Sequence, residues 1–305
     1  MILHDWSNVS VPGRQRFLLS PHQKMLLMPV GDVHAGSDGW PERRFLEHMQ
    51  WGVDQGARFL GMGEYFDFTS TTQRQVLKGL RDSQLRQIDE MVAQEVEAFG
   101  EKIKTTKGRW LGMLEGHHFH EYRDGTTSDQ HLCRLMGTTF LGTSTLLRVR
   151  LEDPKRRSGT KPRGATGGTE IRIFAHHGAA GGGARRIGSG LLRLEDLLMW
   201  IQADIYLMGH IHTKVNAPLQ QLDVTDNGTL YHRTKIIART GGFLRGYLAS
   251  RPHHTRARAA LSRGGYVEQR LLPPATLGGL VLGLGYKRIR EGGVDITIPD
   301  LRCSA

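Results

Sequence analysis

The fold is indicated first by residues 205–212, which read Ile205-Tyr206-Leu207-Met208-Gly209-His210-Ile211-His212. Four apolar residues in a row, closed by a glycine, are typical of a short strand buried on both faces. Two imidazoles follow the glycine, so we expect them at the end of that strand. Strand ends hold side chains on a rigid frame, which favours a functional site there.

Related motifs occur four more times toward the N-terminus. In each, a glycine stands beside carboxylate or imidazole side chains, and most of the motifs follow an apolar run. The four are Gly31-Asp32-Val33-His34, Gly63-Glu64-Tyr65-Phe66-Asp67, Gly116-His117-His118 and His176-His177-Gly178. Eight of the 15 histidines lie in or next to the five motifs: His34, His117, His118, His120, His176, His177, His210 and His212. Imidazole and carboxylate are ligands of borderline divalent cations, so the motifs predict a metal site at strand ends.

Strand and helix patterns alternate through the first two thirds of the chain, which favours an α/β protein. The expected strands are Met25–Val30, Arg58–Met62, Trp110–Leu114, Phe140–Leu151, Ile171–Ala175 and Ile205–Met208. The expected helices are Glu42–Gly56, Asp82–Lys104, one from Ser128, and Leu191–Gln202. A hairpin is predicted for Val215–Leu222 and Leu230–Ala238, and a late strand for Val294–Ile298. We expect one domain over residues 1–240, with a β-rich C-terminal extension, residues 241–305, packed on it.

Composition bears on the partners and the location of the protein. The 305 residues carry 41 Lys and Arg against 30 Asp and Glu, and this net charge of +11 favours polyanionic partners such as nucleic acid, or an anionic membrane surface. No apolar stretch approaches the roughly 20 residues of a transmembrane helix, and the N-terminus lacks the pattern of a signal peptide. Cys133 and Cys303 stand outside the motifs without CxxC pairing, so a cytoplasmic location is expected.

The order of the five motifs resembles the calcineurin-like metallophosphoesterase family, from Met25 to His212. That family's pattern is D-x-H, G-D-x-x-[DN], G-N-H-[DE], H-G and G-H-x-H. The C-terminal tail, including Tyr266-Val267-Glu268, also looks like phage and prophage members of the family. The resemblance implies a four-layer α/β/β/α sandwich with two divalent metal ions at the strand ends and hydrolysis of a phosphate ester.

The resemblance also implies roles for individual residues. The first metal would be bound by Asp32, His34 and His212, the second by His117, His177 and His210, with Glu64 bridging the pair. His118 would be the catalytic histidine that steadies the phosphoryl oxygens and protonates the leaving group. Asp67 is a candidate for orienting a ligand imidazole. Between the adjacent His176 and His177, the family's H-G pattern favours His177 as the ligand.

Two positions depart from the family pattern. Glu64 stands where the family has a bridging Asp; its longer side chain can still bridge but needs more room. His117 stands where the family has Asn, so an imidazole nitrogen replaces a hard amide oxygen. That replacement favours Mn²⁺, Fe²⁺, Zn²⁺ or Ni²⁺ over Mg²⁺, and Mn²⁺ is the ion that we expect.

Basic side chains point to an anionic substrate. Arg185 and Arg186, in the glycine-rich segment after His177, are the expected substrate-binding residues. The resemblance includes a DNA-repair nuclease branch and the charge agrees with it, so the expected substrate is a phosphodiester in DNA or another nucleic acid. The alternatives are a small-molecule phosphatase or (cyclic) nucleotide phosphodiesterase, a lipid-headgroup pyrophosphohydrolase, and a non-catalytic relative that binds nucleic acid.

Overall fold

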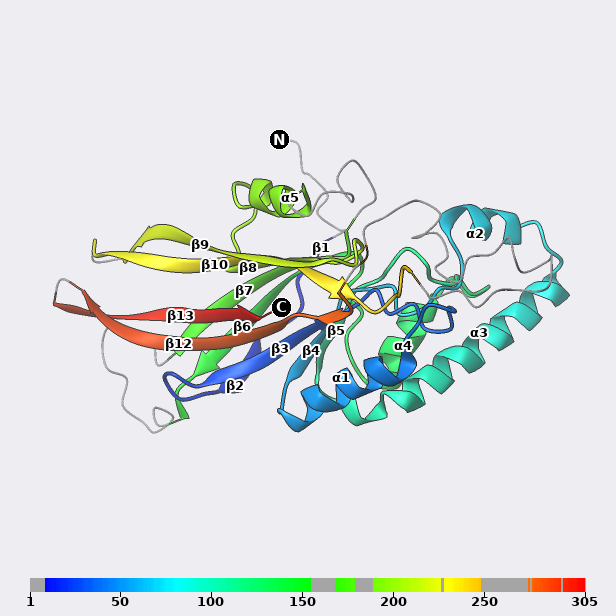
Figure 1. Ribbon diagram of the computed structural model, residues 1–305, viewed down its shortest axis with the longest axis horizontal. Coiled ribbons are helices and arrows are strands. Elements are labelled where there is room, and N and C mark those ends of the chain that lie inside the picture. The colour runs from blue at the N-terminus through cyan, green and yellow to red at the C-terminus, as the bar shows by residue number, and fades with distance from the viewer. Residues whose placement is uncertain are drawn as a thin grey trace.

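Two β-sheets pack face to face, and helices cover both outer faces (Figure 1). This computed structural model describes residues 9–154, 168–178, 189–225, 228–247, 274, 276–291 and 293–304. One sheet has eight strands and the other has five. The expected four-layer α/β/β/α architecture is therefore confirmed.

The five-stranded sheet places three motif-bearing strands side by side. Its strand order is β13 (Val294–Ser304), β12 (Val281–Glu291), β3 (Lys24–Val30), β4 (Arg58–Gly61) and β5 (Trp110–Met113). The strands β3, β4 and β5 are parallel. Helices α1 (Glu42–Asp54) and α3 (Asp82–Lys102) lie in the crossovers between them, as parallel pairing requires. The carboxyl ends of these three strands consequently meet at one edge.

The eight-stranded sheet brings the other two motifs to the same end of the molecule. Its main strand order is β1 (Val9–Ser10), β6 (Ser144–Glu152), β7 (Gly168–His176), β8 (Ile205–Met208), β10 (Leu230–Gly242) and β11 (Gly278–Gly279). In addition, β2 (Gln15–Leu18) pairs with β6, and β9 (Lys214–Val224) pairs with β10. Strands β7, β8 and β10 are parallel neighbours, and α5 (Ser189–Leu197) connects β7 to β8.

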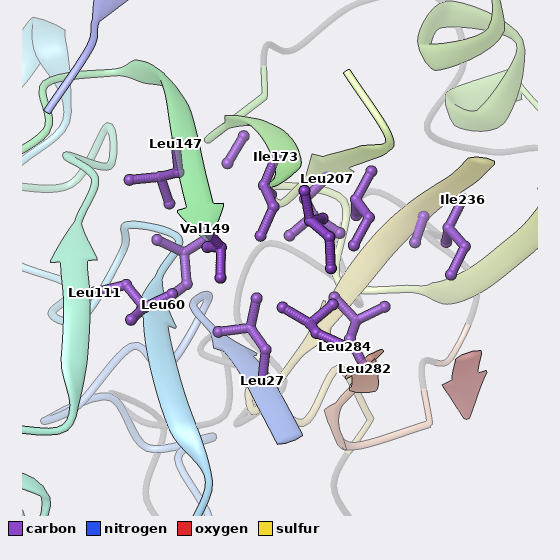
Figure 2. Packing of buried hydrophobic residues seen from close by; sticks show 14 of the residues in the cluster. Leu27, Leu60, Leu111, Leu147, Val149, Ile173, Leu207, Ile236, Leu282 and Leu284 are labelled. Carbon is purple, nitrogen blue, oxygen red and sulfur yellow. The ribbon is translucent and has the colours of Figure 1, made fainter. Parts of the chain in front are cut away.

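The main core lies between the sheets (Figure 2). Apolar side chains from the inner faces meet there, including Leu27, Leu60, Leu282 and Leu284 from one sheet and Leu147, Val149, Ile173, Leu207 and Ile236 from the other. These residues are 0–2% exposed. Burying each such side chain stabilises the fold by about 1.5–3 kcal/mol, so this layer fixes how the two sheets sit on each other.

Separate apolar clusters attach the helices. Helices α1, α3 and α4 (Ser128–Met136) cover the five-stranded sheet through residues such as Phe45, Phe99 and Leu132. Helix α5 covers the opposite sheet, where Leu194 packs in one cluster with Tyr206. The boundaries of α4 follow from its sequence: a capping box joins Thr127 to Gln130, and Gly137 ends the helix with a φ of 62°.

Most expected elements are confirmed, with three corrections. β6 begins at Ser144 rather than Phe140, because the chain makes a left-handed turn at Gly142 first. α5 ends at Leu197 rather than Gln202; beyond it Met199 and Trp200 are 76% and 80% exposed, while Leu198 and Ile201 still contact the apolar cluster under the helix. The strands β1, β2 and β12 and the helix α2 (Thr71–Leu77) were not expected, and the pairing of β12 with β3 and β13 completes the five-stranded sheet.

The β-rich C-terminal extension therefore ends in two strands of the five-stranded sheet. The division of the chain at residue 240 stays a prediction, as β10 runs on to Gly242. Within the described ranges, no helix combines the length and the apolar character needed to cross a membrane.

Candidate metal centre

All five motifs lie at the ends of strands or within three residues after them, and both sheets contribute. In the five-stranded sheet, Asp32 and His34 follow β3, Glu64 and Asp67 follow β4, and His117 and His118 follow β5. In the eight-stranded sheet, His177 follows β7, and His210 and His212 follow β8. Because the two sheets pack face to face with these ends together, the side chains converge in space.

One group of four side chains surrounds the Oε1 atom of Glu64. This atom lies 3.1 Å from Nε2 of His177, 3.3 Å from Nδ1 of His210 and 3.6 Å from Nδ1 of His117. The Nδ1 atoms of His117 and His210 are themselves 3.3 Å apart. One carboxylate oxygen and three imidazole nitrogens thus face a common point, which is a donor set for a borderline divalent cation.

A second group uses the other oxygen of the same carboxylate. Glu64 Oε2 lies 3.0 Å from Nε2 of His34, and Asp32 Oδ1 lies 3.8 Å from Nε2 of His212. The potential ligand atoms of these four residues all lie within 4.8 Å of one another. The structure therefore brings together the seven residues expected as ligands, in two groups that share Glu64.

The two carboxylates are buried, which is costly for a charged group unless a proton or a nearby positive charge compensates it. Asp32 is 0% and Glu64 2% exposed. Burial and the neighbouring Glu64 raise the pKa of Asp32 well above its usual range. Burial alone would raise the pKa of Glu64 too, but the surrounding imidazoles outweigh it and hold that pKa well below its usual range. Buried carboxylates are costly unless they are paired or coordinate a metal, and this pair fits the latter role.

The protonation state of His177 is also the one that a metal ligand needs. Its Nδ1 lies 2.7 Å from the carbonyl oxygen of Met62. A carbonyl oxygen only accepts, so Nδ1 must donate, and in the neutral ring Nε2 then carries a lone pair. Burial lowers the pKa of His177, which favours that neutral ring. The lone pair faces an oxygen of Glu64, and a cation between the two acceptors would relieve their repulsion.

His34 and His212 differ in charge before any metal binds. Burial alone would lower the pKa of His34, but the carboxylates of Asp67 and Glu64 outweigh it and raise that pKa to about 10. Burial, together with the charge on His34, lowers the pKa of His212 to about 3. A metal ligand must be neutral imidazole, so metal binding here would release a proton from His34.

The backbone of the cluster is strained. Among the described residues, six that are not glycine have a positive φ, and five of them belong to this cluster: Asp32, His34, Glu64, His210 and His212, at 48–68°. Such conformations cost about 1 kcal/mol or more each and persist only where the surrounding structure enforces them. Strain concentrated on five clustered polar residues indicates a functional site.

Two glycines explain how the loops come so close. A Cβ atom on Gly116 would lie 2.2 Å from the backbone nitrogen of Glu64. A Cβ atom on Gly63, whose φ is 89°, would lie 2.7 Å from Nδ1 of His177. The glycines in these two motifs are therefore required for the close approach of the ligand-bearing loops.

His118 and Asp67 form a pair on the solvent side of the cluster. Nδ1 of His118 lies 2.7 Å from Oδ1 of Asp67, and the His118 side chain is 27% exposed. The imidazoles of His118 and His34 hold the pKa of Asp67 well below its usual range, so it is a carboxylate that accepts from His118. Nδ1 of His118 is thereby occupied, so Nε2 is the atom that can accept a proton in the neutral ring or donate one in the imidazolium.

Other residues singled out in the sequence lie elsewhere. Within the described part of the chain, none of the metal-binding groups includes His176, whose Nδ1 accepts a hydrogen bond from the N–H of Gly178 at 2.7 Å. His120 pairs instead with Asp89 of α3, at 2.7 Å. Arg185 and Arg186 lie outside the described residues, as does the whole of two further stretches rich in Lys and Arg, residues 155–163 and 251–263.

Two residues near the site were not expected from the sequence to act there. Asp129 of α4 accepts a hydrogen bond from the N–H of Gly116 at 3.0 Å, and burial raises its pKa to about 7. Arg74 donates hydrogen bonds to the loop that carries His117 and His118. Both side chains contact backbone atoms of this loop. Such contacts produce no recognisable spacing of residue types in the sequence.

Comparison with known proteins does not identify a family for this chain. No protein-family model matches the sequence, and no curated protein matches it significantly. A solved structure of vacuolar protein sorting 29 from Cryptosporidium parvum aligns with 92% of this chain and 100% of that chain, at 11% identity and a TM-score of 0.30. A TM-score and an identity this low do not establish a relationship between the two proteins. The chain is thus an α/β sandwich whose buried His, Asp and Glu cluster can bind metal ions.

Proposed function

We propose that this chain is a calcineurin-like metallophosphoesterase that hydrolyses phosphodiesters with two divalent cations, with DNA or another nucleic acid as its substrate. The observation that carries the proposal is the pair of ligand groups that share the Glu64 carboxylate. Two adjacent cations with a bridging carboxylate are the usual arrangement for in-line displacement at phosphorus.

Each of the two ligand groups would hold one cation. Asp32, His34 and His212 would hold one cation, His117, His177 and His210 the other, and Glu64 would contact both. Cations at such a pair of sites activate water as a nucleophile and neutralise phosphoryl oxygens. The imidazole-rich donor set favours Mn²⁺, Fe²⁺, Zn²⁺ or Ni²⁺ over Mg²⁺, and of these four we propose Mn²⁺.

His118 is the proposed general acid. Asp67 accepts from its Nδ1 and would stabilise the imidazolium form, whose Nε2–H can protonate the departing alkoxide and leave the ring neutral. A proton transfer of this kind contributes about 10²- to 10⁴-fold to the rate. The exposure of His118, and of His117 at 42%, supports approach of the substrate from this side of the cluster.

The nucleic-acid part of the proposal rests on charge. A net charge of +11 attracts polyanions, and a phosphodiester backbone is the most common one. Arg185 and Arg186 remain the proposed substrate-binding residues, because they follow His177 closely in the sequence.

The test is cleavage of end-labelled single-stranded DNA in Mn²⁺, with bis(p-nitrophenyl) phosphate as a small diester. The His118→Ala variant is compared with His232→Ala, which removes an exposed histidine of β10. We expect the wild type and His232→Ala to cleave both substrates, and His118→Ala to cleave neither at a comparable rate. Hydrolysis of the small diester alone would contradict the nucleic-acid substrate. If neither substrate is cleaved and no metal is bound, the whole proposal is wrong.

A further inference from the structure

The loop that carries His117 and His118 lacks regular structure of its own. β5 ends at Met113 and α4 begins only at Ser128. Residues 117–119 lie in a bend between them and belong to no helix or strand. Their carbonyl groups therefore need hydrogen-bond partners from another part of the chain.

Among the described residues, a single segment, residues 68–74, supplies these partners. The N–H of Phe68 donates to the carbonyl of His118 at 3.1 Å. The hydroxyl of Thr69 donates to the carbonyl of Phe119 at 2.7 Å. Arg74, in α2 (Thr71–Leu77), donates from Nη1 to the carbonyls of His117 at 2.9 Å and Phe119 at 3.0 Å. The same nitrogen also donates to the carbonyl of Thr69 at 2.6 Å, which ties the segment to itself.

The guanidinium makes a second contact with the loop. Its central carbon lies 4.0 Å from the centroid of the Phe119 ring. A planar guanidinium can stack on a ring and donate in its own plane at the same time, whereas the ammonium of lysine is a single point charge. Arg74 thus holds the carbonyl groups of His117 and Phe119, the residues on either side of His118, together with the Phe119 ring.

We propose that Arg74 is a positioning residue for the imidazoles of His117 and His118. It fixes the backbone from which His117 reaches Glu64 and His118 reaches Asp67, and it does so without touching metal or substrate. This inference rests on the proposed function, because the groups that are positioned are a metal ligand and the general acid. Misplacement of a reacting group by about 1 Å can lower the rate on the order of 100-fold. The contacts that Arg74 makes with this loop should therefore affect the rate of hydrolysis.

Three variants test the positioning role of Arg74. Arg74→Met keeps the length and the apolar contact with Phe119 but removes every donor. Arg74→Lys keeps the charge and can replace only part of the hydrogen bonding. Arg86→Met is the matched control, since Arg86 lies on an exposed face of α3.

Three readouts are compared: hydrogen exchange of residues 114–120 in the metal-free chain, Mn²⁺ titration, and kcat and KM for bis(p-nitrophenyl) phosphate. We expect Arg74→Met to raise exchange in this segment and to weaken one of the two Mn²⁺ sites by about 10- to 100-fold, the usual effect of losing a supporting contact. We expect kcat to fall by a similar factor while KM changes little. Arg74→Lys should be intermediate, and Arg86→Met should match the wild type.

Wild-type exchange and wild-type Mn²⁺ affinity in Arg74→Met would overturn the positioning role. If Arg74→Met does not fold, Arg74→Lys decides, and wild-type values in all three readouts overturn the proposal. Absence of hydrolysis by the wild type would contradict the proposed function instead. Hydrogen exchange in the metal-free chain would still separate Arg74→Met from Arg86→Met in that case, so the two failures are distinguishable.

Discussion

Oε2 of Glu64 lies 3.0 Å from Nε2 of His34, and Oε1 of the same carboxylate lies 3.1 Å from Nε2 of His177. His34 follows β3 of the five-stranded sheet, whereas His177 follows β7 of the eight-stranded sheet. One carboxylate is therefore shared by imidazoles from both sheets. The cluster can form only when the sheets have packed, so metal binding and the sandwich fold are coupled.

Glu64 should be required for both metal ions. We expect Glu64→Gln, which keeps the shape but removes the charge, to lower the affinity of both sites by at least about 100-fold, since even supporting residues cost 10- to 100-fold. Glu115→Gln is the control, because Glu115 lies in the adjacent loop but in none of the ligand groups of the described residues. Metal content after gel filtration, by inductively coupled plasma mass spectrometry, measures the difference. Two ions retained by Glu64→Gln would rule out a shared ligand.

The adjacent histidines after β7 should differ sharply. His177 faces Glu64, whereas Nδ1 of His176 accepts from the N–H of Gly178. We expect His177→Ala to lose one of two Mn²⁺ ions and His176→Ala to keep both, as titration calorimetry can measure. The reverse result would assign the ligand to His176.

His118 should affect catalysis but not metal binding. We expect His118→Gln to lower kcat for a phosphodiester by about 10²- to 10⁴-fold while both ions remain bound. Asp67→Asn should have a smaller effect on kcat, about tenfold, since Asp67 orients the His118 ring and does not itself transfer the proton. Steady-state kinetics and metal analysis on the same samples separate the two effects. Loss of metal in His118→Gln would show that His118 is a ligand instead.

Stability in acid should depend on His48, which lies on α1 and, among the described residues, belongs to none of the candidate ligand groups. Burial, with Lys214 and Arg44 nearby, lowers its pKa from 6.5 to about 4. The unfolded chain thus takes up a proton below pH 6.5 that the folded chain takes up only near pH 4. The stability that neutral His48 contributes is present above pH 6.5 and is lost as the pH falls toward 4.

We expect this loss to reach at most about 3 kcal/mol of unfolding free energy in the wild type and to be absent from His48→Gln. Urea unfolding of both proteins at pH 6.5 and pH 4, in a chelator to remove metal, gives the comparison. An equal loss of stability in both proteins would show that His48 does not titrate in this way.

The site was largely predictable because each of its motifs is local. An apolar run, a glycine and a polar pair can be read directly, and parallel strands then bring their ends together without further information. This is why Asp32, Glu64 and His212 could be expected in one place although 180 positions separate the first from the last.

Long-range contacts explain what the sequence did not reveal. The glycines of β12 weaken its strand pattern, yet they are needed there: a Cβ on Gly285 would lie 2.5 Å from the carbonyl oxygen of Gln23. Arg74 acts through backbone carbonyls, so in sequence it looks like any surface arginine. The strained φ values of Asp32 and Glu64 likewise arise from the hydrogen bonds between their two loops, including the one from the N–H of Val33 to the carbonyl of Glu64 at 2.8 Å.

The most direct test of the central claim is anomalous diffraction at the manganese edge from crystals grown with Mn²⁺. The shared-carboxylate arrangement predicts two anomalous peaks, one on each side of Glu64, with His177 beside one and His34 beside the other. A single peak, or peaks away from Glu64, would contradict the two-metal centre proposed for this chain.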